Sequence, residues 1–310
     1  MGSLRLATRG SPLALRQAEL VAEALARAHP GLEVEPVVVR TTGDRRADVP
    51  LDRIGGQGVF AKEVQAAVAE GRADVAVHSA KDLPSETPDG LVLAAVPRRA
   101  DPRDALVGSS LADLAAGAAV ATGSARRRAQ LANVRPDLTF VELRGNMGTR
   151  LERAEDGSVA AVVVAVAALE RLGWTERISD LLPPSLMLPQ VGQGALALEC
   201  RADDPVALGL LAAVDDEDSH RTLTAERSFL AAAGGSCTVP VAALAATSGD
   251  HVVLQALVAS GDGRVLLRTE RRGADPEVLG REAAVELLNE RGGRSLEGWA
   301  SEWPAAGPAR

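Results

Sequence analysis

Apolar runs and amphipathic segments alternate over the first two thirds of the chain. The run Leu4–Thr8 predicts a strand, and the amphipathic segment Pro12–His29 predicts a helix that Ser11 caps and Pro30 ends. The pattern continues with predicted strands at Leu32–Arg40, Ala73–His78, Ala118–Thr122, Thr139–Leu143 and Ala160–Val166, and predicted helices at Val59–Gly71, Ser124–Asn133 and Asn146–Glu155. This alternation predicts an α/β protein with mostly parallel, doubly wound sheets.

The pattern changes in the last quarter of the chain. Three β-rich runs, Val241–Thr247, His251–Ser260 and Arg264–Arg272, are separated by short turn sequences rich in Gly and Asp. They predict a three-stranded antiparallel sheet, and helices at Pro276–Arg291 and Ser295–Trp303 would cover one of its faces. We therefore expect a smaller α+β domain at the C-terminus.

Two segments rich in Pro, Gly or charge are predicted hinges, Pro97–Asp104 and Leu188–Gly194. The second α/β unit lies between them. The sequence thus predicts two α/β lobes with a cleft between them, and ligands collect at the carboxyl ends of the strands in such folds.

Net charge, apolar runs and cysteine spacing limit the classes of partner and the location that this protein can have. The net charge of −8 argues against a general binder of nucleic acid or anionic membrane, so an anion site has to be local. The N-terminus has no apolar signal-peptide core, and the longest apolar run, Val159–Leu169, is too short to span a bilayer, so we expect a cytoplasmic protein. The two cysteines, Cys200 and Cys237, have no metal-binding or disulfide spacing.

Arginine recurs in three predicted strand-to-helix turns. These turns are Thr8–Pro12, Ala121–Arg128 and Leu143–Arg150. Free N–H groups at a helix start, hydroxyl donors and guanidinium groups together favour a carboxylate or phosphate. For Ala121–Arg128 alone, simple capping by Ser124 with the arginines facing solvent is an equal alternative. Because all three turns lie at carboxyl ends of strands, their convergence indicates a ligand with several anionic groups.

Asp82 follows the predicted strand Ala73–His78 and stands beside Lys81, one of only two lysines among 34 basic residues. A carboxylate there can act as a general acid or base or stabilise a cation, and the neighbouring ammonium affects its charge state. The alternative is an aspartate that only caps a turn before Pro84. His78 is expected to pack or to form a hydrogen bond at the strand end.

The two cysteines differ in their surroundings. Cys237 follows Gly234-Gly235-Ser236 in a predicted loop, where an exposed thiolate could attach a group covalently. Cys200 lies in a predicted buried strand and is expected to be a small apolar residue.

Six segments in this order resemble the porphobilinogen deaminase (hydroxymethylbilane synthase) family over nearly the whole chain: Ala7–Ala14, Ala76–Pro84, Gly123–Gln130, Leu143–Asn146, Pro189–Gly194 and Gly235–Pro240. The resemblance implies two periplasmic-binding-protein-like lobes and a discontinuous first domain. The implied domains are 1–96 with 195–214, 97–194, and 215–310.

The resemblance also implies the reaction. Members of this family condense four porphobilinogen molecules onto a dipyrromethane cofactor, release ammonia at each step and hydrolyse the product to hydroxymethylbilane. Cys237 would hold the cofactor through a thioether, and Asp82 would protonate the leaving amine and stabilise the cation that remains. Each ring carries an acetate and a propionate, which explains local arginine in an acidic chain. The family favours a monomer.

Residue by residue, the resemblance assigns cofactor and substrate binding to a polar set drawn from both lobes: Arg9, Ser11, Phe60, Ser79, Lys81, Thr122, Ser124, Arg126, Arg127, Arg144, Arg150, Arg171 and Gln193. No metal is implied. The sequence departs from the family at two positions, since Gln57 replaces a lysine of the Gly-Gly-Lys-Gly segment and Ser236 replaces a glycine before the cysteine.

Two other functions fit part of the sequence. A non-catalytic anion-binding module would explain the arginine-bearing turns but leaves Cys237 without a role, and such receptors are normally exported. A cysteine acyltransferase would use Cys237 as a nucleophile and would carry a free thiol at rest.

Overall fold

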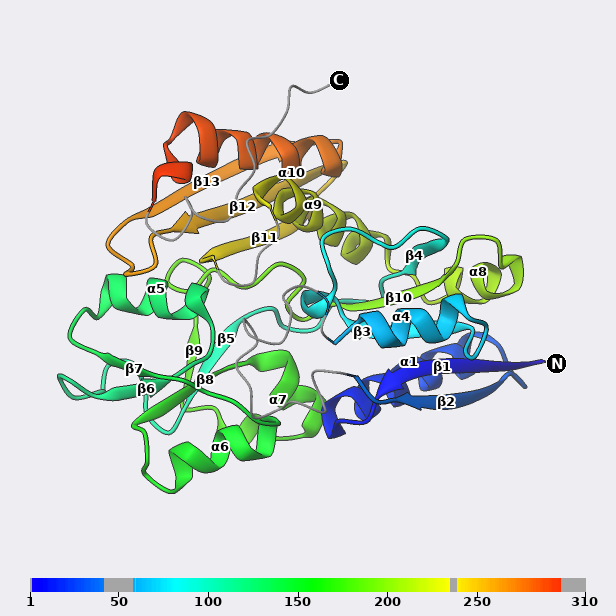
Figure 1. Ribbon diagram of the computed structural model, residues 1–310, viewed down its shortest axis with the longest axis horizontal. Helices are drawn as coiled ribbons and strands as arrows, with labels where there is room; N and C mark the ends of the chain where they lie inside the picture. The colour runs from blue at the N-terminus through cyan, green and yellow to red at the C-terminus, as the bar shows by residue number, and fades with distance from the viewer. Residues whose placement is uncertain (1, 42–57, 59, 235–238, 297–310) are drawn as a thin grey trace.

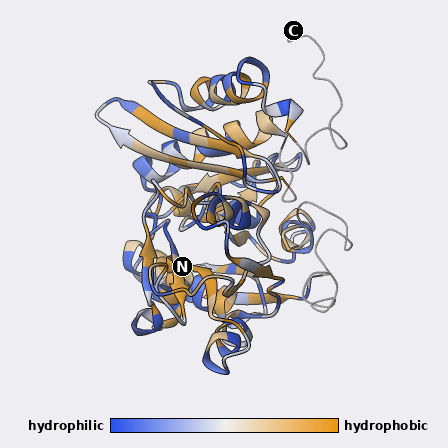
Figure 2. Ribbon diagram, turned by 90° about the vertical axis from the view of Figure 1, so that its left-hand side faces the viewer, coloured by the Kyte–Doolittle hydropathy of each residue, from blue (hydrophilic) through white to orange (hydrophobic). Residues whose placement is uncertain are grey.

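The computed structural model describes residues 2–41, 58, 60–234 and 239–296. It contains two five-stranded mixed sheets and one three-stranded antiparallel sheet, which Figure 1 shows as three separate groups of strands with helices packed around them. The predicted fold class, two α/β lobes and an α+β unit, is confirmed. Figure 2 shows hydrophobic residues concentrated on the strands and hydrophilic residues on outer helices and turns.

The first lobe is built on a sheet with the strand order β2-β1-β3-β10-β4. Its strands are β1 (Ser3–Arg9), β2 (Glu33–Val39), β3 (Val75–Ser79), β4 (Leu91–Ala95) and β10 (Leu196–Arg201), and its helices are α1 (Pro12–Ala28), α4 (Lys62–Ala69) and α8 (Pro205–Ala212). Side chains alternate between the faces of the sheet, so Leu6 packs with Leu25 of α1, whereas Ala7 packs with Val64 of α4. The sheet is therefore covered by helices on both sides.

The second lobe repeats this plan with the order β7-β6-β8-β5-β9. Its elements are β5 (Asp104–Val107), β6 (Ala119–Ala121), α5 (Ala125–Val134), β7 (Thr139–Val141), α6 (Met147–Glu155), β8 (Ala161–Ala165), α7 (Val166–Leu172), a 3₁₀ turn (Thr175–Arg177) and β9 (Asp180–Leu182). Leu131 of α5 packs on one face, and Leu151 of α6 with Leu169 of α7 packs on the other.

Both predicted hinges are links between the two sheets. One leads from β4 into β5, the other leads from β9 into β10, and both strands that follow a link run antiparallel to their neighbours. The links are joined to each other, because Ala100 N–H donates to the Gly194 carbonyl at 3.2 Å and the Gln193 amide donates to the Pro102 carbonyl at 2.8 Å. Since β10 pairs with β3 and β4, the chain returns to the first sheet. The domain boundaries given above stay a prediction.

The sheet of the third unit is covered by its own helices on one face and contacts the second lobe with the other. Strands β11 (Val241–Ser248), β12 (His251–Ala259) and β13 (Leu266–Gly273) lie under α9 (Glu217–Ala233) and α10 (Pro276–Val285), with Phe229, Leu254 and Leu279 in the shared core. The opposite face contacts the second lobe through Leu257 and Ala129 of α5. The predicted helix Pro276–Arg291 continues beyond α10 as a π-helical turn (Glu286–Glu290), and a 3₁₀ turn (Gly293–Ser295) follows. Most of the predicted helix Ser295–Trp303 lies outside the described residues.

Candidate active site

Asp82 lies in a 3₁₀ turn, Ala80–Asp82, that directly follows β3. The segment that leads from β9 into β10 forms hydrogen bonds with the backbone of this turn. The Ala80 N–H donates to the Ala195 carbonyl at 3.0 Å, and the Gln190 amide donates to the Lys81 carbonyl at 3.2 Å. The backbone of the turn that carries the predicted catalytic residue is therefore held between the first lobe and the link.

Gly192 allows the link to approach this turn closely. Its backbone has a φ of +71°, and a Cβ there would lie 3.0 Å from the carbonyl carbon of Ala80 and 3.0 Å from the amide nitrogen of Lys81. Any other residue would meet both backbone strain and a steric contact. The position of Lys81 and Asp82 thus depends on a glycine in another segment.

Positive charges from the second lobe surround Lys81 and Asp82. The pKa of Lys81 is lowered to about 8, chiefly by burial and also by the charges of Arg127 and Arg150, while Asp82 and Asp104 oppose the shift. The pKa of Arg150 is likewise lowered to about 10, chiefly by burial and also by repulsion from Arg127 and Arg144, while the charge of Asp82 opposes the shift. The structure therefore brings Asp82 and Lys81 of the first lobe into one electrostatic environment with arginines of the second.

The arginine turn after β6 is buried. Thr122 lies in the interior, Ser124 caps α5 by accepting a 3.4 Å hydrogen bond from Arg127 N–H, and Arg126 and Arg127 are buried as well. The alternative with solvated arginines is wrong for these two residues and holds for Arg128, which is exposed.

A buried carboxylate that the sequence analysis missed, Asp104, organises this turn. Arg126 Nη1 lies 2.8 Å from Asp104 Oδ2, Arg127 Nη2 lies 2.7 Å from Oδ1, and the Gln193 amide donates to Oδ1 at 2.9 Å. Burial alone would raise the pKa of Asp104, but the two guanidinium groups outweigh it and hold that pKa well below its usual range. No sequence signal separated Asp104 from the other 41 acidic residues.

Arg144 lies in the turn after β7, and Arg150 lies in the first part of α6, which follows that turn. Arg144 Nε lies 3.2 Å from Glu142 Oε1, and Arg150 Nε donates to the Gly145 carbonyl at 2.9 Å. Asn146 caps α6 through a 3.1 Å hydrogen bond from Thr149 N–H. Both arginines are partly buried. Their guanidinium groups can therefore still contact the anionic groups of a ligand.

The remaining predicted residues of the first lobe lie at neighbouring strand ends. The Arg9 guanidinium lies 4.0 Å from the centre of the Phe60 ring, at the end of β1, and Ser11 caps α1 by accepting a 3.3 Å hydrogen bond from Ala14 N–H. The Ser79 hydroxyl is held by Gln17, whose amide donates to it at 2.8 Å. Because β1 and β3 are parallel neighbours, these side chains share one edge of the sheet.

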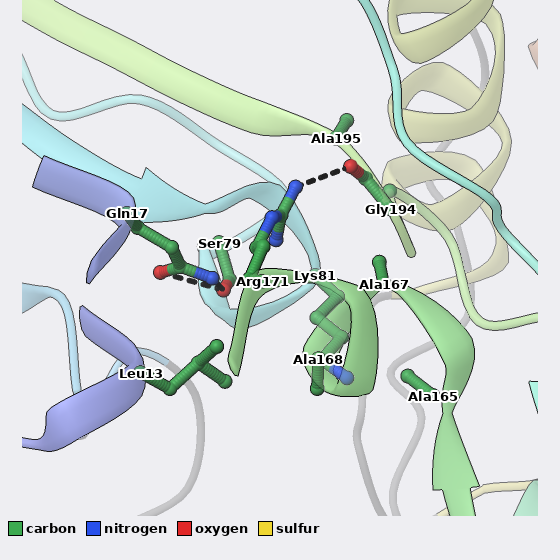
Figure 3. Close-up of a pocket in the computed structure, with 11 residues that line it drawn as sticks. Leu13, Gln17, Ser79, Lys81, Ala165, Ala167, Ala168, Arg171, Gly194 and Ala195 are labelled. Carbon is green, nitrogen blue, oxygen red and sulfur yellow. Dashed lines mark hydrogen bonds between the residues drawn. The ribbon is translucent and has the colours of Figure 1, made fainter. Parts of the chain in front are cut away.

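Arg171 reaches across from the second lobe. Figure 3 shows its guanidinium in a small cavity with Gln17, Ser79 and Lys81, where it donates to the Gly194 carbonyl at 2.6 Å. Burial lowers the pKa of Arg171 to about 10, and the nearby charge of Glu170 opposes this shift.

Cys237, Gln57 and Ser236 lie outside the described residues. Cys200 is buried in β10, where burial raises the pKa of its thiol to about 11, as expected for a small apolar residue. His78 is buried with its Nε2 3.2 Å from Glu199 Oε2, in agreement with a packing role. Among the described residues, no cluster of three or more His, Cys, Asp and Glu side chains could hold a metal.

Two solved structures with a distant resemblance to this chain are of proteins with two-lobed binding domains. A periplasmic VFT2 domain of BvgS from Bordetella pertussis is 18% identical, covers 73% of this chain and 92% of its own, and gives a TM-score of 0.39. A substrate-binding domain of a putative molybdenum ABC transporter from Clostridium difficile is 10% identical, covers 70% and 93%, and gives a TM-score of 0.42. At such scores neither likeness bears on function.

Sequence families give a clear match. Residues 4–208 match the family model "porphobilinogen deaminase, dipyromethane cofactor binding domain", and residues 220–289 match "porphobilinogen deaminase, C-terminal domain". The porphobilinogen deaminase of Roseiflexus sp. (strain RS-1) is 50% identical over 95% of this chain and 98% of its own, and that of Syntrophus aciditrophicus (strain SB) is 45% identical over 94% and 97%. The chain therefore belongs to the porphobilinogen deaminase family, which comprises transferases of tetrapyrrole biosynthesis.

Proposed function

We propose that this chain joins four porphobilinogen molecules head to tail, with Asp82 as the acid–base group and the arginines of the second lobe as carboxylate ligands. The observation that carries these roles is the shared electrostatic environment of Asp82, Lys81, Arg127 and Arg150 at the meeting of the two lobes. The family match supports the substrate and the reaction.

Asp82 would move a proton at two points in each round. In its acid form it donates a proton to the leaving amine, which departs as ammonia, and the resulting carboxylate stabilises the cationic substrate carbon. After the new carbon–carbon bond has formed, the same carboxylate accepts the proton that the ring carbon loses. The hydrogen bonds to Ala80 and Lys81 would keep the backbone of the Ala80–Asp82 turn in place for both transfers.

The described residues fit an acidic cofactor. Among them, the buried Nε and Nη2 groups of Arg126 have no hydrogen-bond partner, although Nη1 is engaged by Asp104 and Leu188. Buried guanidinium donors without partners are costly, and carboxylates satisfy them in pairs. When bound to Cys237, the dipyrromethane would supply the pyrrole carbon to which each new ring is joined.

The other arginines would bind the acetate and propionate groups of the rings. Arg9, Arg127, Arg144, Arg150 and Arg171 lie at strand or helix ends that face the meeting of the lobes, with Ser11, Ser79, Thr122 and Ser124 as hydroxyl donors and Phe60 beside Arg9. The cavity beside Arg171 has a volume of about 20 Å³, enough for about one water molecule. A pyrrole ring would enter this part only if the lobes move apart, which the two links allow.

We further propose that the enzyme acts as a monomer in the cytoplasm. No helix within the described ranges is long and apolar enough to cross a membrane.

Intact-mass measurement tests the proposed function. The purified wild-type protein should carry an adduct equal to two substrate-derived pyrrole rings and give a colour with Ehrlich's reagent, and it should convert porphobilinogen to hydroxymethylbilane. Cys237→Ser should lose the adduct and the turnover, whereas the matched control Cys200→Ser should keep the adduct. An unmodified thiol in wild-type protein that converts porphobilinogen would overturn the attachment of the cofactor at Cys237. An unmodified protein that does not convert porphobilinogen would overturn the proposed function and favour the acyltransferase or the anion-binding module.

A further inference from the structure

A second and larger cavity lies beside the links between the lobes, outside the proposed active site. Its volume is about 350 Å³, within the range of small-molecule sites. Helix α1 lines it with Leu20 and Ala24, the first link with Pro97 and Arg98, and α7 with Glu170 and Arg171. Of the residues that were given active-site roles above, only Arg171 is among those that line this cavity.

The lining combines an apolar floor with exposed positive charge. Leu20, Ala24, Leu196 and Val214 supply apolar surface, and the charged residues of the lining are Arg16, Arg98, Arg171 and Glu170. Arg16 is engaged by Glu19 and Glu23, at 3.1 and 3.0 Å. Arg98, by contrast, is exposed and makes no hydrogen bond or ion pair within 4.0 Å with another residue that the structure describes. Its charge reaches Asp216, where it adds to the hydrogen bonds from Ser219 in lowering the pKa of that carboxyl. Such a lining favours a ligand with an apolar body and one anionic group.

The cavity is connected to the active site through two elements. Arg171 lines both this cavity and the small cavity that holds Lys81 and Ser79. Helix α1 also contributes to both, with Leu13 and Gln17 on the active-site side and Leu20 and Ala24 here. Moreover, α1 of the first lobe packs against α7 of the second, so the walls of the cavity belong to both lobes. A relative movement of the lobes has to change its shape.

We propose that this cavity binds a small amphipathic carboxylate, whose anionic group meets Arg98 and whose apolar body lies on Leu20, Ala24 and Val214. A ligand that contacts both lobes favours the arrangement in which its contacts are best, and it opposes movement away from that arrangement. Occupancy therefore slows turnover. This second part rests on the proposed function, whereas the binding itself does not.

Calorimetric titration of the cofactor-bearing protein with 1-naphthaleneacetate tests the site. A ligand of this size should bind with a Kd of about 1 mM or tighter, from typical efficiencies per atom. The neutral 1-naphthaleneacetamide and the variant Arg98→Gln should each weaken binding by ~5-fold or more, since a charge-assisted hydrogen bond is lost. Arg27→Gln, on an exposed position of α1, is the matched control and should bind as wild type does.

A cavity-filling variant separates this site from the active site, which also binds carboxylates. Ala24→Phe should abolish both binding and inhibition, whereas Ala26→Phe on the exposed face of α1 should preserve both. Binding that survives Ala24→Phe and Arg98→Gln unchanged, or no binding to the wild type, would overturn the proposal. Binding without any effect on porphobilinogen turnover would overturn its second part. A wild-type protein that binds through Ala24 and Arg98 but does not convert porphobilinogen would leave the site standing and remove the proposed function.

Discussion

The two α/β lobes share a strand order and yet bring opposite chemistry to their meeting point. In both sheets the fourth strand, β10 or β5, follows a link and runs antiparallel to its neighbours. The first lobe contributes Asp82 and Lys81 on a short turn, and the second contributes arginines on the turns after β6 and β7. The shared topology places the strand ends together, and the residues on the turns decide what happens there.

Asp104 and Asp82 illustrate the chemical difference between the two lobes. Asp104 of the second lobe is fully buried, held by Arg126, Arg127 and Gln193, and its pKa is well below the usual range, so it stays ionised. Asp82 of the first lobe is only partly buried and lies on a turn that the backbone holds. A fully buried carboxylate in direct ion pairs with two guanidinium groups is suited to fixing them, whereas a partly exposed one is suited to exchanging protons with a substrate.

Replacing the proton-transferring carboxylate should have the largest effect. Asp82→Asn should fold, keep the two-ring adduct and lower kcat by ~10²–10⁴-fold, as is typical for a lost acid–base group. Steady-state turnover of porphobilinogen checks this, with adduct retention confirmed by intact mass. Asp89→Asn, an exposed acid in the following loop, is the matched control and should turn over normally. Near-normal turnover in Asp82→Asn would remove Asp82 from the mechanism.

Replacing the organising carboxylate should act on stability. Asp104→Asn leaves two buried guanidinium groups without their shared counter-ion, so the free energy of unfolding should fall by about 3–5 kcal/mol. Urea denaturation measures this loss, with the exposed Asp203→Asn as control. A denaturation curve like that of the wild type would show that Asp104 does not organise the arginine turn.

Sequence reasoning predicted the layers of this fold better than the contacts of its site. The strand and helix periods, the cap at Ser11 and the turns of the last sheet were sufficient for the fold class. The family motifs pointed to Asp82 and the arginines, whose roles stay predictions. Helix α7 was missed, because β8 passes directly into it at Val166 without a polar cap. Asp104, Gln130 and Gln17 were missed because their partners are distant in sequence: Gln130 holds Leu188, and Gln17 holds Ser79.

The close approach of the link to the catalytic turn can be tested with a pair of glycines. Gly192→Ala and Gly157→Ala both place a side chain at positive φ, but only at position 192 does the new Cβ meet other atoms. Both variants should lose about 1–3 kcal/mol of stability from backbone strain. Only Gly192→Ala should also lower kcat, because the Ala80–Asp82 turn has to shift. Equal kcat values for the two variants would show that the approach does not matter for catalysis.

The smallest expected effect is the titration of Lys81. Since the chain has only two lysines, Lys62 and Lys81, NMR of ¹³C-lysine protein should give two resolvable signals, and Lys62→Arg assigns them. In Cys237→Ser protein without cofactor, Lys81 should titrate near pH 8 because burial lowers its pKa. Its folded-state pKa lies below the ordinary value of 10.5, so the unfolded chain binds more protons between these values and stability should rise with pH from about 8 to 10.5.

The attached cofactor should reverse part of this shift. Its carboxylates favour the ammonium form, so the midpoint of Lys81 should be higher in the cofactor-bearing protein. A Lys81 signal that titrates near its ordinary value in both forms would show that Lys81 does not lie in the buried, positively charged environment described here.

The division of labour between the lobes is tested most directly by separating kcat from KM in two cofactor-bearing variants, Asp82→Asn and Arg150→Gln. If the first lobe transfers protons and the second binds carboxylates, Asp82→Asn lowers kcat while KM changes little, and Arg150→Gln raises KM for porphobilinogen by ~10-fold or more, since a charge-assisted bond is lost. A fall in kcat alone for Arg150→Gln, together with a rise in KM alone for Asp82→Asn, would contradict the account.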